Sequence, residues 1–339
     1  MQDVARLAGV SPMTVSRVLS RRGNVRADLR ARVEKAIAES GYRRNENARS
    51  LRPGHRSGLI GVTITNIANP YYAEMQLGIE EVAAQRSRRI LVGNSHEDPD
   101  VESQLVADFL GRQVEGLIVV PATTGDVPHL HAQQLSGVPL ALASRAVAGL
   151  DVDTVLVDDV GGSIAAVADL IREGHRRIGF LGTSLSIFTG ARRMRGYREA
   201  HALHGLDVDE RLIRVGHQDV AAAETAMVEL LTSADPPTAV FTANNRNTLG
   251  AMRAMRRQGP LWEAHRQVRI HGFDSLEIAD FSPVRLSLVT HDPRELGRQV
   301  ARMLTERLDG VDARDRPGST IELPVELRDV TGHENAVQR

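Results

Sequence analysis

Residues 3–19 constrain the fold of this chain more than any other stretch, because they carry the signals of two short helices joined by a tight turn. Apolar residues recur at helical spacing up to Gly9, which stands where a helix ends in a left-handed residue. Ser11 then offers a capping oxygen, and Pro12 suits the first position of a second helix. This layout is typical of a DNA-reading helix-turn-helix, although an ordinary pair of helices in an all-helical domain has the same spacing.

A third helix is predicted over residues 27–40, and Gly41 ends it. Each of the three helices has apolar positions that we expect to share one small core: Val4, Leu7 and Ala8; Val15, Val18 and Leu19; Leu29, Val33, Ala36 and Ile37. The solvent face of the second helix then carries small and polar side chains and one arginine: Pro12, Met13, Thr14, Ser16 and Arg17.

The run DVARLAGVSPMTVSRVLS resembles the opening of the lactose/galactose repressor family. The resemblance implies a DNA-binding headpiece over 1–44, with the second helix in the major groove. It places Pro12, Met13 and Arg17 at the main base-reading positions, where Arg17 would contact guanine. It also implies contacts that set position on the phosphate backbone, at Ser11, Thr14, Ser16 and Asn24.

Residues 45–57 are similar to the family's hinge helix, which orders when two chains meet on DNA. In that interpretation Leu51 is an apolar wedge in the minor groove, Ala48 lets paired helices approach, and Arg52 holds the groove. The alternative for Leu51 is a linker residue packed on the core. Residues 1–57 contain thirteen Arg or Lys and five Asp or Glu, a net charge of +8, whereas the remainder carries −9. A basic head on an acidic body is what phosphate binding at one end requires.

From residue 58 onward, unbroken apolar strands alternate with amphipathic helices, which predicts parallel sheets covered on both faces. We expect two doubly wound halves, as in the periplasmic sugar-binding folds that this region resembles. The first half is expected at about 58–157 plus 288–318, and the second at about 158–287 plus 319–339. A final strand and helix at 286–309 would cross back to the first half. Such folds bind ligands between the halves, at the carboxyl ends of the strands.

Family correspondence implies which residues bind a small-molecule effector, expected to be a sugar or a sugar derivative. Arg193, Asn244 and Asp274 match effector contacts, and their directional hydrogen bonds suit sugar hydroxyls. Tyr71 or Tyr72 would supply a stacking surface, with core packing as the alternative. Arg145 and Asp158 would be rim contacts, with a salt-bridged surface as the alternative.

The sequence departs from the family pattern where relatives generally have Asn-Asp followed by Met-Ala. This chain has Asn-Asn-Arg-Asn-Thr at 244–248, so a carboxylate is lost and a guanidinium, Arg246, is gained. The change argues against a neutral sugar and favours an anionic ligand.

Other function classes find little support in the sequence. There is no Cys, G-x-S-x-G, H-E-x-x-H, G-x-G-x-x-G or Walker loop, so we expect neither an enzyme nor a bound cofactor or metal. His201 and His204 have helical spacing and are expected to be solvated. A plain solute-binding protein is disfavoured by the basic head and the missing signal peptide. No apolar run is long enough to span a membrane. We expect a cytoplasmic homodimer, most simply a repressor, that binds a pseudo-palindromic operator in double-stranded DNA and has no membrane partner.

Overall fold

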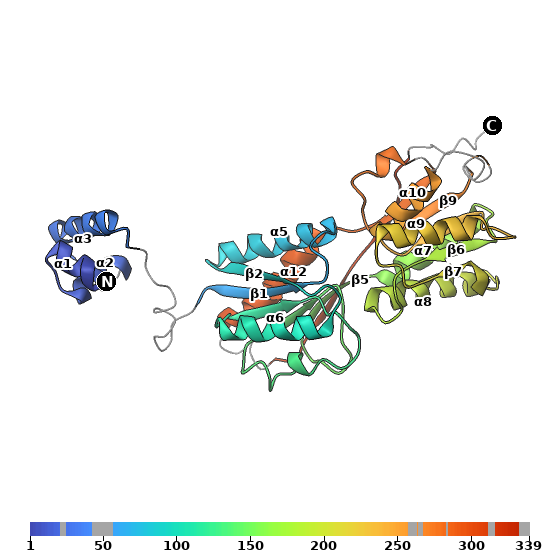
Figure 1. Ribbon diagram of the computed structural model, residues 1–339. Helices are drawn as coiled ribbons and strands as arrows, with labels where there is room; N and C mark the ends of the chain where they lie inside the picture. Colours follow the sequence, from blue (N-terminus) through green and yellow to red (C-terminus); the bar gives the residue numbers. More distant parts are fainter. Residues whose placement is uncertain are drawn as a thin grey trace. The chain divides into compact units, whose positions relative to one another are not determined.

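The computed structural model describes residues 1–20, 25–42, 57–256, 263, 267–282, 284–310 and 316–331 (Figure 1). The chain divides into two compact units, Met1–Ser57 and Gly58–Arg339.

The first unit contains three helices, α1 (Gln2–Ala8), α2 (Pro12–Ser20) and α3 (Ala27–Ser40). Gly9 ends α1 with a φ of 61°, and the backbone N–H of Thr14 donates to Ser11 Oγ at 3.1 Å, so both predicted turn signals are confirmed. Buried apolar residues of all three helices form one core: Val4, Ala5, Ala8, Val15, Val18, Val33 and Ala36. The prediction for Leu7 is wrong, because Ala5 takes the inward position and Leu7, ~100° round the helix from Ala8, is 59% exposed.

The second unit contains two six-stranded sheets. The first sheet is parallel throughout and has the order β11-β5-β4-β3-β1-β2. Its strands are β1 (Leu59–Ile64), β2 (Arg89–Asn94), β3 (Gly116–Val119), β4 (Leu140–Ala143), β5 (Asp153–Val157) and β11 (Thr320–Leu323). One face packs on α5 (Pro70–Gln85) and α12 (Pro293–Asp309), and the other on α6 (Pro99–Gly111) and the short turn η1 (Pro128–Leu130).

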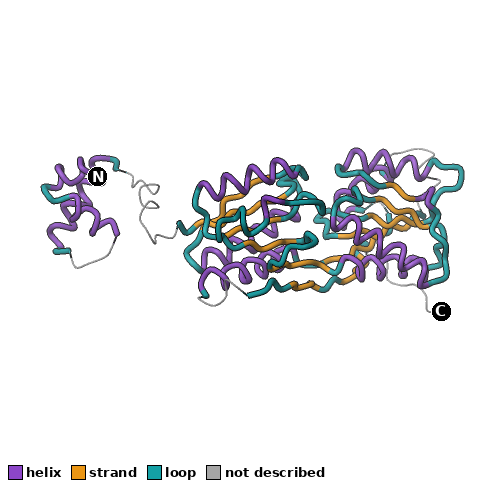
Figure 2. The backbone as a smooth tube through the Cα atoms, turned by 90° about the horizontal axis from the view of Figure 1, so that it is seen from below, coloured by secondary structure: helices purple, strands orange, loops and turns teal. Residues whose placement is uncertain are grey.

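The second sheet has the order β12-β10-β9-β8-β6-β7 and is parallel except for β12, which runs antiparallel to β10. Its strands are β6 (Ile178–Leu181), β7 (Ile213–Arg214), β8 (Ala239–Thr242), β9 (Arg269–Phe273), β10 (Leu286–Thr290) and β12 (Glu326–Asp329). One face packs on α7 (Asp159–Arg172) and α8 (Phe188–Leu203), and the other on α9 (Val220–Leu231) and α10 (Asn245–Met255). Two short turns complete this half, η2 (Glu210–Leu212) and η3 (Ala279–Phe281). Figure 2 shows helices on both sides of the strands in each half, and the predicted doubly wound fold is confirmed.

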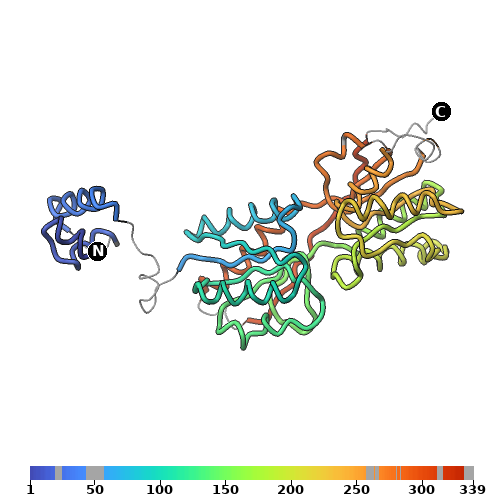
Figure 3. Tube along the Cα trace, in the orientation of Figure 1, coloured from blue at the N-terminus to red at the C-terminus, as the bar shows by residue number. Residues whose placement is uncertain are grey.

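The chain passes between the two halves after β5, after β10 and after β11. Figure 3 shows the late segments α12 and β11 returning to the first half. The boundaries between the two halves therefore differ from the expected ones at two places. Residues 288–290 belong to the second sheet, because β10 pairs with β9 through Val289. Residues 320–323 belong to the first sheet, because β11 pairs with β5. The predicted crossing strand, β10, stays in the second half, whereas the predicted crossing helix, α12, returns to the first.

Three strands were missed by sequence reasoning, since β7 has two residues and the burial of β11 and β12 is partial. In the described part of the chain, no helix combines the length and apolar character that a membrane crossing needs.

Candidate functional site

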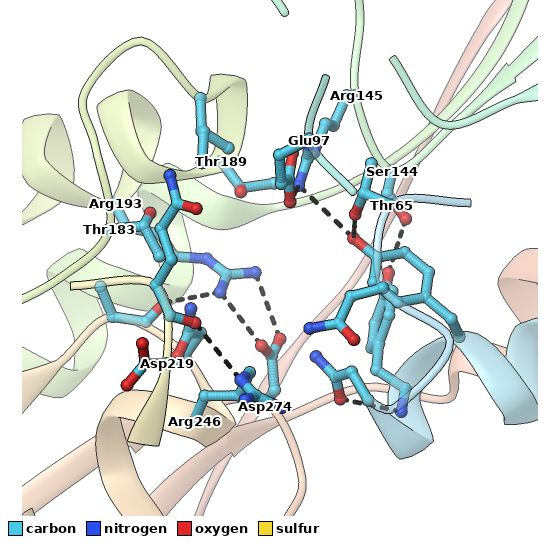
Figure 4. Close-up of a pocket in the computed structure, with 18 of the residues that line it drawn as sticks. Thr65, Glu97, Ser144, Arg145, Thr183, Thr189, Arg193, Asp219, Arg246 and Asp274 are labelled. Atoms are coloured by element: carbon cyan, nitrogen blue, oxygen red, sulfur yellow. Dashed lines mark hydrogen bonds and ion pairs between the residues drawn. The ribbon is translucent and has the colours of Figure 1, made fainter. Parts of the chain in front are cut away.

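A polar cavity of about 300 Å³ lies between the two halves of the second unit (Figure 4). Its lining comes largely from the carboxyl ends of parallel strands. Thr65 follows β1 and Ser144 follows β4 in the first half, whereas Thr183 and Asp274 follow β6 and β9 in the second. The sequence predicted this location, because parallel strands of doubly wound folds end at one edge of each sheet.

Six of the seven predicted effector residues line this cavity: Tyr71, Tyr72, Arg145, Arg193, Asn244 and Asp274. The seventh, Asp158, is not among the lining residues. Its carboxylate is occupied at the start of α7, where Oδ1 accepts from the Gly161 N–H at 2.8 Å. The residue that reaches the cavity network from this segment is its neighbour Asp159.

Arg193 is held from three directions, and its side chain is almost completely buried. Nε donates to Asp159 Oδ1 at 2.8 Å, and the terminal nitrogens donate to the two Asp274 oxygens, each at 3.2 Å. Nη1 also donates to the Ala243 carbonyl at 2.6 Å, and the guanidinium lies 3.7 Å from the Phe273 ring centre. Burial opposes the charge, but Asp274 and Asp159 outweigh it and raise the pKa of Arg193. The guanidinium is thus fixed in orientation at the wall of the cavity (Figure 4).

Asp159 is the most strongly perturbed carboxyl beside the cavity. Burial raises its pKa to about 6, against the opposing effect of the Arg193 charge. Its Oδ2 makes no hydrogen bond with any described residue and lies 3.7 Å from Arg192 Nε. Sequence reasoning missed Asp159 because it selected the adjacent Asp158 as a rim contact, and burial distinguishes the two residues only in the fold.

Arg145 forms a second fixed guanidinium on the opposite wall. It makes a two-pronged ion pair with Glu97, at 2.6 and 2.8 Å, and donates to the Pro121 carbonyl at 2.8 Å. The alternative of an exposed surface salt bridge is wrong for Arg145, since the residue is only 6% exposed. It also donates to the Tyr72 hydroxyl at 3.4 Å.

Both tyrosines contribute to the cavity and also to packing. Tyr71 shares a hydrogen bond of 2.6 Å with Ser144 Oγ, and Tyr72 accepts one of 2.7 Å from Thr65. Their rings meet edge to face with centres 5.1 Å apart. Burial raises the pKa of both hydroxyls, so they remain protonated donors. Tyr72 belongs to the main apolar core as well, so it both lines the cavity and packs in the core.

The second half also contributes two residues from the start of α10. Asn244 caps this helix, because its Oδ1 accepts from the Asn247 N–H at 2.8 Å, and its amide NH₂ can still donate to a ligand. Arg246 lines the cavity and donates from Nε to the Gln218 carbonyl at 3.3 Å. Unlike Arg145 and Arg193, Arg246 forms no ion pair with a carboxylate in the described ranges.

Several lining residues were not predicted: Thr65, Asn66, Asn69, His96, Glu97, Ser144, Thr183, Ile187, Thr189, Gln218 and Asp219. A polar residue just after a buried strand is a usable signal, and it would have found Thr65, Ser144 and Thr183. Glu97 and Asp219 lie in loops before helices and carry no comparable signal.

The predicted DNA-reading face lies on α2 of the first unit. Ser11, Pro12, Met13 and Arg17 are exposed, whereas Thr14 and Ser16 are half-buried. Arg17 Nη2 lies 3.9 Å from Met13 Sδ, so the two longest side chains of this face lie together. The remaining predicted DNA contacts, Asn24, Ala48, Leu51 and Arg52, lie outside the described residues.

The expectation for His201 is wrong. It is 2% exposed, its Nδ1 lies 2.9 Å from the Tyr197 carbonyl, and its ring packs 4.4 Å from the Tyr197 ring. His201 is therefore a satisfied core residue, whereas His204 is exposed at the end of α8.

Comparison with known proteins covers both units. Residues 1–45 match the profile described as bacterial regulatory proteins, lacI family, and residues 57–326 match periplasmic binding proteins and sugar binding domain of LacI family. Catabolite control protein A of Priestia megaterium is 32% identical over 97% of this chain and 98% of its own length. The HTH-type transcriptional regulator GalS of Salmonella typhimurium is 33% identical over 86% of this chain and 84% of its own.

Solved structures of regulators share this fold over nearly the whole chain. The transcriptional regulator CelR in complex with cellobiose is 28% identical, with a TM-score of 0.70 over 96% of this chain and 97% of that one. The lac repressor dimer bound to operator and an anti-inducer has a TM-score of 0.79 over 97% of this chain and 98% of that one. At 24% identity, the second likeness supports the fold alone.

Proposed function

The chain belongs to the LacI family of DNA-binding transcriptional regulators, and from this premise we propose that it is a repressor released from or held on its operator by a sugar derivative. It is a regulator with a sugar-binding type of effector domain and not an enzyme. The proposal adds the repressor role, a pseudo-palindromic operator bound by a homodimer, and the class of effector. One observation carries it: a single chain combines an exposed α2 face with a polar cavity lined from both halves of the second unit.

The first unit supports operator binding. Its α2 presents Met13 and Arg17 beyond a buried apolar face, and residues 1–57 carry a net charge of +8. Arginine can make two hydrogen bonds to guanine in the major groove, which discriminates bases by roughly 1–3 kcal/mol. Two copies related by a two-fold axis would read two inverted half-sites, which predicts the pseudo-palindrome.

The cavity supports a small polar effector. Its volume of about 300 Å³ is at the lower end for small-molecule sites. Fixed guanidinium and carboxylate groups, with several hydroxyls and amides, match the paired donors and acceptors of a sugar. Arg246 adds a cation that forms no ion pair with a described carboxylate, which favours a derivative with an acidic group such as a sugar acid or sugar phosphate.

Control follows from the position of these groups on both halves. A ligand that contacts Arg145 in the first half and Arg193 in the second changes the relative free energies of the arrangements of the two halves. It can shift operator affinity only through its different affinity for those arrangements, typically 1–3 kcal/mol of coupling.

The test is selection of operator sequences from a random duplex library by the purified full-length protein, with and without sugars, sugar acids and sugar phosphates. We expect an inverted repeat, and an occupancy that at least one acidic sugar changes. Arg17→Ala should lower specific affinity by about 10-fold or more, whereas Arg30→Ala on the exposed side of α3 should have little effect. Failure to enrich any sequence would refute the proposal.

A further inference from the structure

A buried histidine on β9 faces two carboxylates at the C-terminal end of α7, on the sheet face that α7 covers and separate from the effector cavity. His271 is completely buried, Asp169 lies in the last turns of α7, and Glu173 follows that helix directly. One nitrogen or oxygen atom of each residue lies within 4.8 Å of the others. Four residues apart, Asp169 and Glu173 share one side of the helix.

The hydrogen bond at Nδ1 determines the state of the His271 ring. Nδ1 lies 2.9 Å from the carbonyl oxygen of Ala166, which can only accept, so Nδ1 carries a proton. Complete burial favours the neutral ring, and in a neutral ring protonated at Nδ1 the Nε2 atom bears a lone pair. Nε2 is buried and makes no hydrogen bond in the described part of the chain.

This lone pair faces a carboxylate. Nε2 lies 3.8 Å from Asp169 Oδ2, so two acceptors oppose each other in a low-dielectric site. Two such groups are stable together when a positive species lies between them.

Two arginines flank the proposed carboxylates. Arg172 pairs with the second oxygen of Asp169, Oδ1, at 2.8 Å. Arg269 lies 3.3 Å from Glu173 Oε2, donates to Ser287 at 2.7 Å and lies 3.6 Å from Asp329. Arg269 Nε makes no hydrogen bond to any described group, so it contacts Glu173 as an ion pair only.

We propose that Asp169, Glu173 and His271 bind a divalent transition-metal ion, with Zn²⁺ the best match. One imidazole nitrogen and two carboxylate oxygens are ligands that Zn²⁺ accepts, at roughly 2.0–2.2 Å. The bond from Nδ1 to a backbone carbonyl is the support that fixes the ring of a metal-binding histidine. The Asp169 and Glu173 side chains are partly exposed, so the ion can enter from solvent and keep water as a further ligand.

Such an ion would join α7 to β9 and stabilise the second half. The proposal does not depend on the proposed function, because its ligands lie outside both the cavity and the first unit. Sequence reasoning considered only His201 and His204 for metal binding, and nothing in the sequence brings residue 271 next to residues 169 and 173.

The experiment uses the untagged full-length protein after treatment with a chelator and dialysis. Titration with Zn²⁺ by calorimetry should show one ion per chain, and titration with Co²⁺ should give a visible absorption band of a bound ion. Glu173→Gln and Asp169→Asn should each weaken Zn²⁺ binding by about 10-fold or more, and His271→Gln should remove the Co²⁺ band. Glu199→Gln on α8 and His204→Gln directly after it are the matched controls and should bind as the wild type does.

Absence of saturable Zn²⁺ binding would overturn the proposal, as would equal affinity in the wild type and both carboxylate variants. Because His271 is buried, His271→Gln can impair folding, and in that case the two partly exposed carboxylate variants decide the outcome. Circular dichroism of each variant without metal establishes that the fold is intact.

Discussion

Asn69 and Asn245 exchange two hydrogen bonds between their side-chain amides, across the boundary between the two halves of the effector domain. Asn245 Nδ2 donates to Asn69 Oδ1 at 2.8 Å, and Asn69 Nδ2 donates to Asn245 Oδ1 at 3.3 Å. Asn69 caps α5 in the first half, and Asn245 is the first residue of α10 in the second. The pair therefore joins the two halves directly, beside the cavity that Asn69 lines.

Replacement of Asn245 by alanine should loosen this contact. Two hydrogen bonds, each worth about 1 kcal/mol net, are lost, and alanine is compatible with the first turn of a helix. Hydrogen–deuterium exchange should become faster at residues 66–71 and 244–248, with little change elsewhere. Asn66→Ala is the matched control, because the Asn66 side chain bonds to Ala68 within its own half. Equal exchange in Asn245→Ala and the wild type would show that the pair does not restrain the halves.

Arg193→Ala should remove the response to any metabolite that raises the melting temperature of the wild type. It should also lower the free energy of unfolding by about 3–5 kcal/mol, since Asp159 and Asp274 lose a buried partner. Thermal shift and urea unfolding measure the two effects. Arg195→Ala, an exposed residue of the same helix paired with Glu199, should cost about 0.5 kcal/mol or less. A retained metabolite response in Arg193→Ala would contradict the assignment of the cavity.

Asp159 should make the protein less stable as the pH rises from about 4 to about 6. Its pKa in the folded state, about 6, is above the ordinary value of 3.8, so the folded state holds this proton more tightly than the unfolded state. In that window the folded state binds more protons, and the free energy of unfolding falls with rising pH, by up to about 3 kcal/mol.

The comparison of wild type with Asp159→Asn isolates this contribution. Buried histidines whose pKa is lowered by burial, such as His201 and His291, act in the opposite direction but are present in both proteins. Urea unfolding at pH 5 and pH 7 should show a smaller loss of stability on going to pH 7 in Asp159→Asn than in the wild type. The same change in both proteins would contradict the prediction.

The features that could be predicted from the sequence are those with local or periodic signals. Gly9 and Ser11 mark the turn of the first unit, and apolar runs mark the central strands of both sheets. The location of the cavity followed from the ends of those strands. The paired carboxylates could not be predicted, because Glu97 meets Arg145 and Asp159 meets Arg193 only through the fold. The strands β11 and β12 were missed for the same reason, since their partial burial gives a weak pattern and their partners lie far away in the sequence.

The crossing of α5 and α12 depends on two glycines, Gly78 and Gly297. A Cβ at Gly297 would meet the Met75 carbonyl oxygen, and a Cβ at Gly78 would meet that of Arg294, both far inside contact distance. The obstacles are backbone atoms of the facing helix, so no side-chain rotation can relieve the clash. The two helices must therefore separate when either glycine is replaced.

Gly297→Ala should consequently lower the free energy of unfolding by about 1–3 kcal/mol, despite the better helix propensity of alanine. Gly111→Ala at the end of α6 is the matched control, because a Cβ there has no atom within 4 Å. We expect it to be neutral or stabilising by up to about 1 kcal/mol. Urea unfolding followed by circular dichroism compares the two variants with the wild type. If Gly297→Ala were as stable as Gly111→Ala, α12 could not be packed against α5 at backbone contact, and the return of α12 to the first half would need a different basis.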